Sequence, residues 1–432
     1  MSTRPSNGGA LTRRDFTRLL TVAGSASIFG GPALAWSAPP PLAQMPAARN
    51  EAYWMSVRAQ FAMPRDISVM NAANLCPSSL PALKALDEAT RDMDRDPSFQ
   101  NRGKMGEGKE HTRTIVARFL GVTPEAIVIT RNTSEANNTV SSGLDLKAGD
   151  EVVIFADNHP SNNAAWKEKA ERFGFTVTEI PIVNPHPGPE HYLAEVKKAL
   201  TPATKLVSVT HLTNTIGDLF PVKAICALAH ERGVMSLVDG AQSFGLLAVD
   251  LADIQPDFYT GSAHKWPCGP KETGVLYVNQ RNQTKLWASI ISAGAGRVGI
   301  SKTIERYGQR DEPAIIAFGE ALELQMTIGR EAIEARSREL AQALMEGLSG
   351  IDGVEVRTSR NPEHSAAVVV FKPGDLEPAK LFNALYQNEK IGCAPRGGAD
   401  RSGLRFSPHF YNLHEEIDRT VAAIARYMQT GV

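Results

Sequence analysis

Short apolar runs alternate with helical patterns between about residue 66 and residue 312, and this alternation restricts the fold more than any other feature. Several runs are almost continuously hydrophobic, as expected for strands buried on both faces of a sheet. Strands separated by helices pair in parallel, with the helices covering the sheet. We therefore predict an α/β large domain with a mostly parallel seven-stranded sheet wrapped by helices. The runs are Ala126–Thr130, Glu151–Phe155, Phe175–Ile182, Lys205–Thr210, Val234–Val238, Asp257–Gly261 and Gly274–Val278.

The pattern changes after Pro313. Two long helical segments, Ala314–Ile328 and Arg330–Leu348, are followed by short strand-like and helical segments in mixed order, among them the strand-like run Lys390–Ala394. This is an α+β pattern, which predicts a smaller C-terminal domain. We expect residues 36–65 to form a spacer and an N-terminal arm, residues 66–312 the large domain, and residues 313–432 the connecting helices and the small domain.

Residues 1–35 differ in character from the rest of the chain. The pair Arg13 and Arg14 precedes a weakly apolar run, Leu19–Ala35, that ends in small residues suited to cleavage. The run is too polar and too short for a stable membrane span. A disordered tail with a chance Arg-Arg pair is the alternative. The order of the features predicts a twin-arginine signal, export to the periplasm or secretion, and the twin-arginine translocase as a partner.

Charge and cysteine content exclude several classes of function. The formal net charge is −1, which gives no electrostatic reason to expect nucleic acid or acidic membranes as partners. Four cysteines lie far apart, and no two have the spacing of a zinc site or a redox dithiol. We predict no metal site and no disulfide framework, while a single bridge stays open.

A lysine stands at the end of one predicted strand. Lys265 lies in residues 261–270, which read GSAHKWPCGP, directly after an apolar run and before a turn rich in Gly and Pro. A lysine by itself is usually a solvent-exposed side chain. At a strand's carboxyl end, burial and nearby positive charge lower the amine pKa, which makes the lysine a nucleophile for Schiff bases.

An acidic residue ends the strand that precedes Lys265 in the chain. Asp239 terminates the run Val234–Val238, and a carboxylate there is costly to bury without a partner. Taken alone, it could cap a helix or form a structural ion pair. Its functional interpretation is a carboxylate that keeps a pyridinium nitrogen protonated, so that the ring withdraws electrons from the substrate. Adjacent strands would bring Asp239 and Lys265 to the two ends of one ring.

A possible phosphate site precedes both residues. Residues 130–137, TRNTSEAN, supply a strand end, a turn rich in hydroxyls and a helix start. Backbone N–H groups and hydroxyls at a helix N-terminus bind phosphate. A plain helix-capping arrangement is the equal alternative.

Seven segments together resemble the class V aminotransferases, a family of pyridoxal-5′-phosphate enzymes of fold type I that includes cysteine desulfurases and isopenicillin N epimerases. They occur in the family's order over roughly residues 60 to 430, and the GQRD turn is similar to that of the epimerase-like branch. The segments are RNTSEAN (131–137), NHPSN (158–162), HLTNTIG (211–217), VDGAQ (238–242), SAHK (262–265), GQRD (308–311) and LRFSPHFYN (404–412).

The resemblance implies pyridoxal phosphate as the cofactor and a role for each matching residue. Lys265 would form the Schiff base with the cofactor and then move a proton at the substrate α-carbon. Asp239 would pair with the ring nitrogen, and His159 would stack on the ring. Gln242 and Asn214 would hydrogen-bond the ring hydroxyl.

The remaining roles concern the phosphate, the substrate and the second subunit. Arg310 lies in the turn that reaches the phosphate of the neighbouring subunit in this branch, which implies a homodimer. Arg405 would bind the substrate carboxylate through a two-pronged contact that lysine cannot reproduce; an ordinary salt bridge is its alternative. The residues expected to hold the phosphate are Thr133, Ser134, Ser262 and His264.

The expected activity is chemistry at the α-carbon or amine of an amino-acid-like or peptide substrate, by transamination, epimerisation or elimination, in secondary-metabolite tailoring. A cysteine desulfurase is the alternative, and it needs an exposed, mobile cysteine. Cys393 lies in an apolar context that indicates burial, and nothing near Cys268 lowers its pKa. Gln309 stands where the family has threonine, which removes one hydroxyl from the cross-subunit contact. A non-catalytic module that binds the cofactor is a third possibility.

Overall fold

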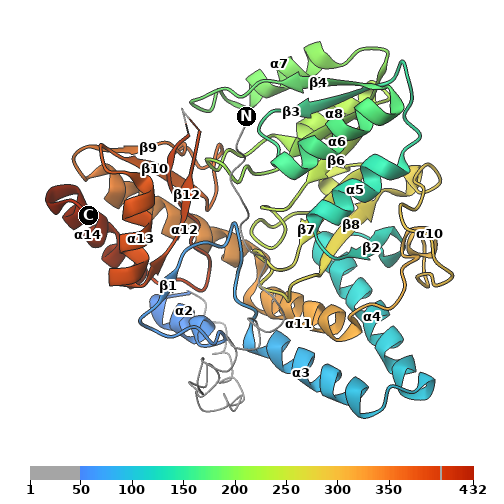
Figure 1. The fold of residues 1–432 in the computed structure, drawn as a ribbon, viewed down its shortest axis with the longest axis horizontal. Helices are drawn as coiled ribbons and strands as arrows, with labels where there is room; N and C mark the ends of the chain where they lie inside the picture. The colour runs from blue at the N-terminus through green and yellow to red at the C-terminus, as the bar shows by residue number, and fades with distance from the viewer. Residues whose placement is uncertain (1–48, 399–400) are drawn as a thin grey trace, which may run out of the picture. The chain divides into compact units, whose positions relative to one another are not determined.

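The computed structural model describes residues 49–398 and 401–432, and its main element is a seven-stranded sheet (Figure 1). Strand β8 pairs antiparallel with both of its neighbours, β2 and β7, and the other pairs are parallel. The predicted α/β fold with a mostly parallel seven-stranded sheet is therefore confirmed. In spatial order the strands are β2 (Ile127–Thr130), β8 (Gly274–Val278), β7 (Phe258–Ser262), β6 (Met235–Asp239), β5 (Thr204–Thr210), β3 (Glu151–Phe155) and β4 (Thr176–Ile180).

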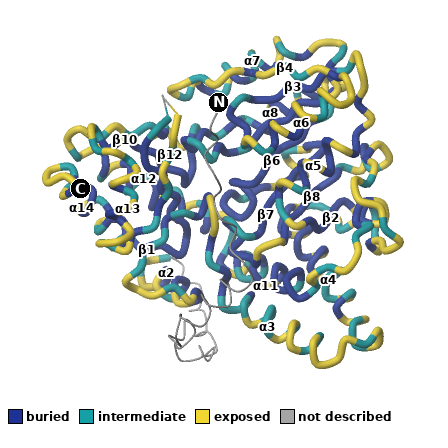
Figure 2. The backbone as a smooth tube through the Cα atoms, viewed as in Figure 1, coloured by how far each residue is buried: buried dark blue, intermediate teal, exposed yellow. Residues whose placement is uncertain are grey.

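Both faces of the sheet are buried along its inner strands, which explains their nearly continuous apolar sequences, whereas the edge strand β4 is partly exposed and contains Thr176, Thr178 and Glu179. Val153 and Phe155 of β3 join one hydrophobic cluster, whereas Val152 and Ile154 join a second cluster on the opposite face. Successive side chains of a strand point to opposite faces, so each face needs its own apolar cover. Figure 2 shows the inner strands of the large sheet as buried and the outer turns of the helices as exposed.

Helices supply that cover. Ala136 of α5 and Trp166 of α6 pack in one cluster, and Ile115 of α4 and Ile225 of α8 pack in the other. The α-helices that precede the C-terminal part are α2 (Glu51–Arg58), α3 (Leu80–Arg95), α4 (Phe99–Leu120), α5 (Thr133–Gly143), α6 (Pro160–Phe173), α7 (Pro189–Ala199), α8 (Val222–Glu231), α9 (Leu251–Ile254), α10 (Ser301–Ile304) and α11 (Glu312–Ile328).

A smaller antiparallel sheet forms the C-terminal part, as predicted. Its four strands lie in the order β12-β13-β10-β9, and helix α12 packs against α14 beside them. The elements are α12 (Arg330–Ser349), β9 (Val354–Val356), β10 (Val369–Pro373), α13 (Pro378–Glu389), β11 (Ile391–Gly392), β12 (Ala394–Arg396), β13 (Gly403–Phe406) and α14 (His414–Thr430).

Some elements differ from the sequence prediction. The run Lys390–Ala394 is divided between two sheets, because β11 pairs in parallel with β1 (Ser68–Val69) and β12 pairs with β13. The strand pair β1 and β11 joins the region after the N-terminal arm to the C-terminal part, and the expected domain boundaries stay a prediction.

The predicted signal, residues 1–35, lies outside the described residues. Within residues 49–398 and 401–432, no helix combines the length and the apolar character that crossing a membrane requires.

Candidate active site

Four predicted site residues follow neighbouring strands at one edge of the large sheet. His159 comes after β3, Asn214 after β5 and Lys265 after β7, while Asp239 is the last residue of β6. The strands β7, β6, β5 and β3 are adjacent in that order and parallel, so their carboxyl ends meet. In sheets of this kind, ligands bind at the carboxyl ends of the strands. The topology therefore brings these residues together.

The Asp239 carboxylate is buried and is held by neutral donors. Its Oδ2 accepts hydrogen bonds from Nδ2 of Asn137 at 2.9 Å and of Asn162 at 3.4 Å, and its Oδ1 accepts one from the Ala241 N–H at 3.0 Å. Gly240 lets the ring of Tyr259 approach closely, because a Cβ at that position would lie 2.1 Å from Tyr259 Cζ. No side chain in the described part of the molecule forms an ion pair with Asp239, so its charge is available to a cationic ligand.

The Lys265 amine loses its proton more readily than an ordinary lysine. Burial lowers its pKa to about 8, with the charge of Arg405 acting in the same direction and that of Asp239 opposing it. These couplings place the amine within electrostatic range of both groups. The backbone next to it is fixed, because the Trp266 carbonyl accepts hydrogen bonds from Gln325 Nε2 at 2.6 Å and from His409 Nε2 at 2.7 Å.

Gln242 lies in the same region, with its side-chain amide bound at both ends. Its Nε2 donates to the Ala73 carbonyl at 2.9 Å, and its Oε1 accepts from the indole N–H of Trp266 at 2.8 Å. The indole contact fixes which end of the amide is the donor. One N–H of Gln242 is left for a ligand, consistent with the expected contact to a ring hydroxyl.

His159 caps helix α6 and carries a neutral ring. Its Nδ1 lies 2.7 Å from the hydroxyl of Ser161 and accepts the Ser161 N–H at 3.2 Å. Burial, reinforced by the charge of Lys265, lowers the pKa of His159, and Arg396 and Arg405 act in the same direction. An uncharged imidazole near Lys265 is suited to stacking on a flat ring.

The predicted phosphate residues lie at the start of helix α5 and after β7. The Thr133 N–H and hydroxyl both lie 2.8 Å from the Ser262 hydroxyl. Ser134 is exposed, and its hydroxyl is 3.5 Å from that of Ser161. Burial, with the charge of Lys265, lowers the pKa of His264 to about 4, so this ring is neutral. Hydroxyls and a helix N-terminus are thus gathered at one place.

Arg310 lies beside the same turn but outside the group around Lys265. Its Nη1 donates to the Ile129 carbonyl at 3.2 Å, and its guanidinium stacks 4.8 Å from the ring centroid of Tyr307. It lines a cavity of about 320 Å³ together with Gln309 and Glu135. Within a single chain, Arg310 therefore lies beside the β2–α5 turn, in the wall of this cavity.

Arg405 reaches the sheet edge from strand β13 of the C-terminal part. It is 1% exposed, and its two terminal nitrogens donate to neutral oxygens, the Asn214 carbonyl at 2.9 Å and Asn71 Oδ1 at 3.0 Å. Its Nε is buried without a hydrogen-bond partner. Burial, together with the charge of Arg396, lowers the pKa of Arg405 to about 9. A buried guanidinium without a carboxylate partner is suited to binding an anionic ligand.

Sequence reasoning missed the residues that hold the charged groups. Asn137 and Asn162 position Asp239, Asn71 positions Arg405, and Trp266 orients Gln242. Asn137 and Asn162 lie in the segments RNTSEAN and NHPSN, but their roles were not predicted. A polar amide on the helix face that packs against the sheet is the sequence feature that could have indicated them. No sequence feature indicated Asn71, because it lies far from Arg405 along the chain.

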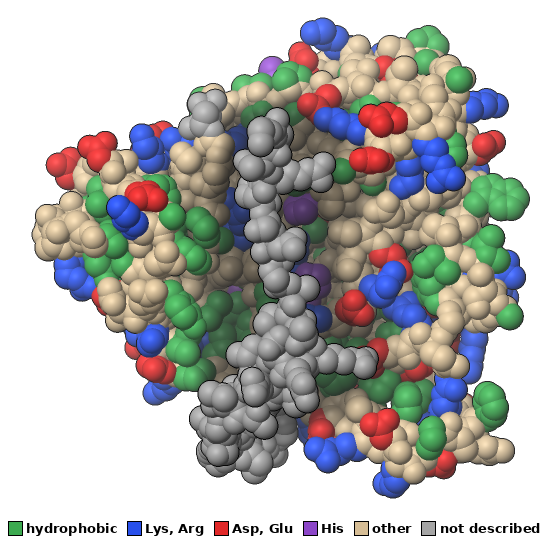
Figure 3. Space-filling model, in the orientation of Figure 1, with side chains coloured by type: hydrophobic (Ala, Val, Ile, Leu, Met, Phe, Trp, Pro, Cys, Tyr) green, Lys and Arg blue, Asp and Glu red, His purple; other side chains and the backbone are tan. Residues whose placement is uncertain are grey.

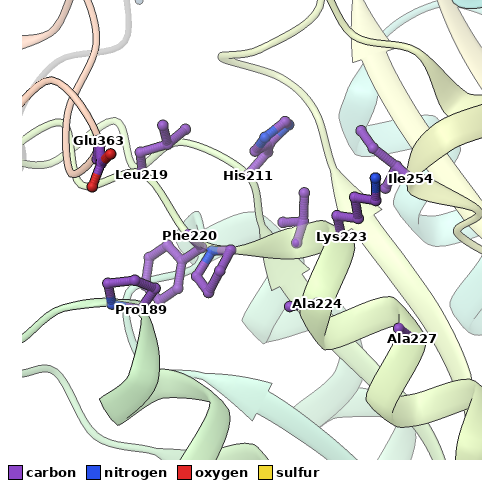
Figure 4. A pocket seen from close by; sticks show the side chains of 11 residues that line it. Pro189, His211, Leu219, Phe220, Lys223, Ala224, Ala227, Ile254 and Glu363 are labelled. Atoms are coloured by element: carbon purple, nitrogen blue, oxygen red, sulfur yellow. The ribbon is translucent and has the colours of Figure 1, made fainter.

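The molecular surface agrees with this location. Figure 3 shows a hollow between the C-terminal part and the part built on the large sheet, with histidine side chains inside it. A roomier cavity of about 510 Å³ lies against helix α8 and is mostly apolar, with His211, Lys223 and Glu363 as polar lining residues (Figure 4). None of the predicted site residues lines that cavity, so the volume of a cavity does not by itself locate the active site.

The fold and this site define a pyridoxal-phosphate enzyme of the α/β type, and comparison with known proteins identifies its family. The family profile described as Aminotransferase class-V matches residues 83–420. Isopenicillin N epimerase of Amycolatopsis lactamdurans is 28% identical, covering 86% of this chain and 98% of that protein. A probable cysteine desulfurase of Methanothermobacter thermautotrophicus is 29% identical, covering 84% and 94%. The structure of a cysteine desulfurase from Thermococcus onnurineus NA1 matches with a TM-score of 0.78 and 25% identity, covering 87% and 98%.

The chain belongs to the class-V aminotransferase family, and its cofactor is pyridoxal phosphate. The residues fit this group. Asp239 is an anion without a cationic hydrogen-bond partner, as a protonated ring nitrogen requires. The hydroxyls of Thr133 and Ser262 and the start of α5 suit the phosphate, and Lys265 supplies an amine with a lowered pKa.

Proposed function

We propose that this protein acts at the α-carbon or amine of an amino-acid-like or peptide substrate, as an aminotransferase, epimerase or lyase. The carrying observation is that Asp239, Lys265 and His159 end or follow adjacent parallel strands at one edge of the sheet, where the buried Arg405 donates to the Asn214 carbonyl and has no acidic partner among the described residues. An amino acid offers both groups that this arrangement receives, an amine and a carboxylate.

Bound pyridoxal phosphate supplies an electron-withdrawing ring that stabilises the carbanion formed when a bond at the α-carbon breaks. Asp239 would keep the ring nitrogen protonated, because its described hydrogen-bond donors are all neutral. Lys265 would hold the cofactor, and its amine would accept or deliver the proton at the substrate α-carbon. Arg405 would bind the substrate α-carboxylate and orient the α-carbon.

The visible spectrum of the purified holoenzyme tests this proposal. The lysine-bound cofactor absorbs in the violet, and the band should shift when an amino acid is added. In Lys265→Ala the band should be lost and turnover should fall by more than about 10³-fold, since both the attachment point and the proton carrier are removed. An unchanged band in Lys265→Ala would contradict the assignment of this residue.

Sulfur chemistry on the same cofactor is the second candidate, because cysteine desulfurases are among the similar proteins. The four cysteines argue against a desulfurase that uses its own thiol, since all four are buried. Burial raises the pKa of Cys393 to about 12, so that thiol is not ionised near neutral pH. If Cys393→Ser abolished sulfide release from cysteine, the desulfurase would be the correct function; we expect no effect.

We further propose that the protein is exported through a twin-arginine signal and works as a homodimer. The motif around Arg13 and Arg14 supports the first, and the position of Arg310 in a cavity beside the β2–α5 turn, apart from the group around Lys265, supports the second. Cell fractionation tests export, which Arg13→Lys combined with Arg14→Lys should block. Sedimentation of the purified protein tests the dimer, and a monomer at micromolar concentration would contradict it.

A further inference from the structure

A second arginine lies beside Arg405. Arg396 is the last residue of strand β12, and Ala394, two residues before it, pairs directly with Arg405 of β13. Paired residues of antiparallel strands project to the same face of a sheet, and so do residues two apart along one strand. Arg396 and Arg405 are therefore diagonal neighbours on one face of the four-stranded sheet.

Neither guanidinium has a carboxylate partner within residues 49–398 and 401–432. Arg405 contacts only the neutral oxygens of Asn214 and Asn71. Arg396 is partly buried, its Nε is fully shielded from solvent without a partner, and its side chain makes no hydrogen bond or ion pair to a described residue. Holding two cations close together away from water costs free energy, which a bound anion would recover.

The charge of Arg396 acts on the site itself. After burial, it is the larger cause that lowers the pKa of Arg405, and it also contributes to the lowered pKa of His159. Both groups belong to the site described above. Because Arg396 and Arg405 are also diagonal neighbours on one face of the sheet, one substrate can contact both.

Arg396 lines a cavity that adjoins the carboxylate site. The cavity measures about 440 Å³, and Thr215, which follows Asn214 in the chain, lies in its wall. No Asp or Glu is among the described residues that line it. Arg401 also lines it, but Asp157 neutralises that charge, with both carboxylate oxygens 2.6 Å from Arg401 Nη1. Among the described residues that line this cavity, Arg396 is the cation without a carboxylate partner.

We propose that Arg396 binds a second acidic group of the substrate, so that the enzyme selects an amino acid or peptide with a carboxylate beyond its α-carboxylate. This inference rests on the proposed function, which gives the α-carboxylate to Arg405. A guanidinium that meets a carboxylate in a partly buried site forms charge-assisted hydrogen bonds, and their loss weakens binding by about 10- to 100-fold.

The test compares each acid with its neutral amide. The holoenzyme is titrated with aspartate and asparagine, glutamate and glutamine, and 2-aminoadipate and its side-chain amide, with binding followed by the change in visible absorption. In at least one pair, the acid should bind about tenfold or more tightly than the amide. In Arg396→Gln that ratio should fall to about one while the amide binds as before, which also shows that the variant is folded.

Two controls separate the possible results. Arg405→Gln should weaken the acid and the amide alike, because both contain the α-carboxylate. Arg91→Gln, at an exposed residue paired with Asp87, should leave the ratio unchanged. Equal binding of acid and amide by the wild type, or an unchanged ratio in Arg396→Gln, would overturn the assignment of Arg396. If no amino acid changed the wild-type spectrum, the proposed function itself would fail.

Discussion

Two buried arginines of this protein, Arg113 in the large domain and Arg405 in the C-terminal part, have opposite surroundings. Arg113 of helix α4 is 0% exposed and binds Glu305 through two nitrogens, at 2.5 and 3.0 Å, and Glu110 through two contacts. Burial alone would lower the pKa of Arg113, but the two carboxylates outweigh it and raise the pKa. Arg405 is 1% exposed and has only neutral acceptors, so its pKa is lowered to about 9.

The difference separates a structural cation from one that binds a ligand. An arginine that has its own acids stabilises the fold only as part of that ion pair, and removing it leaves buried carboxylates uncompensated. An arginine without acids is held in place at a cost, which a ligand carboxylate offsets. Replacing each arginine should therefore affect different properties, Arg113 the stability and Arg405 the function.

The largest expected effect is on folding. Arg113→Met removes both nitrogens that bind the buried Glu305 carboxylate and leaves it with only Lys109 at 3.8 Å and the Ile129 N–H, so the free energy of unfolding should fall by about 3–5 kcal/mol. Denaturant unfolding of both variants measures this. Arg405→Met is the matched control, because it removes an unpaired buried cation, and its stability should be unchanged or higher. A similar loss of unfolding free energy in both variants would contradict the distinction between Arg113 and Arg405.

The next effect is on substrate binding. In Arg405→Lys the two-pronged contact to a carboxylate is lost, and kcat/KM for an amino-acid substrate should fall by roughly 100-fold. The melting temperature should stay near that of the wild type, since no protein carboxylate depends on this residue. Steady-state kinetics measure the fall in kcat/KM, and thermal unfolding measures the melting temperature. A variant that loses stability but keeps its KM would place Arg405 with the structural arginines.

A smaller effect is expected at the buried anion. Asn137→Ala removes one of three hydrogen bonds to the Asp239 carboxylate, and pyridoxal phosphate should bind more weakly by about 1–2 kcal/mol, roughly tenfold. Dialysis of the holoenzyme against cofactor-free buffer measures the loss. Asn138→Ala, at the exposed neighbouring position, is the control and should retain the cofactor as the wild type does.

The smallest effect concerns pH. Lys265 has a pKa lowered to about 8, so the apoenzyme should capture pyridoxal phosphate about tenfold more slowly for each unit below pH 8 and reach a plateau above it. An ordinary lysine would keep gaining rate toward pH 10. Arg405→Gln removes a positive charge that lowers this pKa, so the inflection should move to higher pH. An inflection that stayed in place would show that the two groups do not interact.

Much of the fold could be read from local patterns. All seven runs are strands of the large sheet, and the inner strands have nearly continuous hydrophobic sequence because both of their faces are buried. The edge strand β4 is partly exposed and contains polar residues. The run Lys390–Ala394 was read as one strand, yet its two ends pair with different partners. Periodicity shows that a segment is extended but does not choose its partner.

The sequence by itself determined the strands, the order of the motifs and the residue types that a pyridoxal-phosphate site requires. Only the tertiary structure decided which charges are compensated. Glu305, which neutralises Arg113, lies 192 residues further along the chain, and Asn71, which holds Arg405 without neutralising it, lies 334 residues before it. Apolar burial follows from local composition, whereas the pairing of a buried charge depends on groups that meet only after folding.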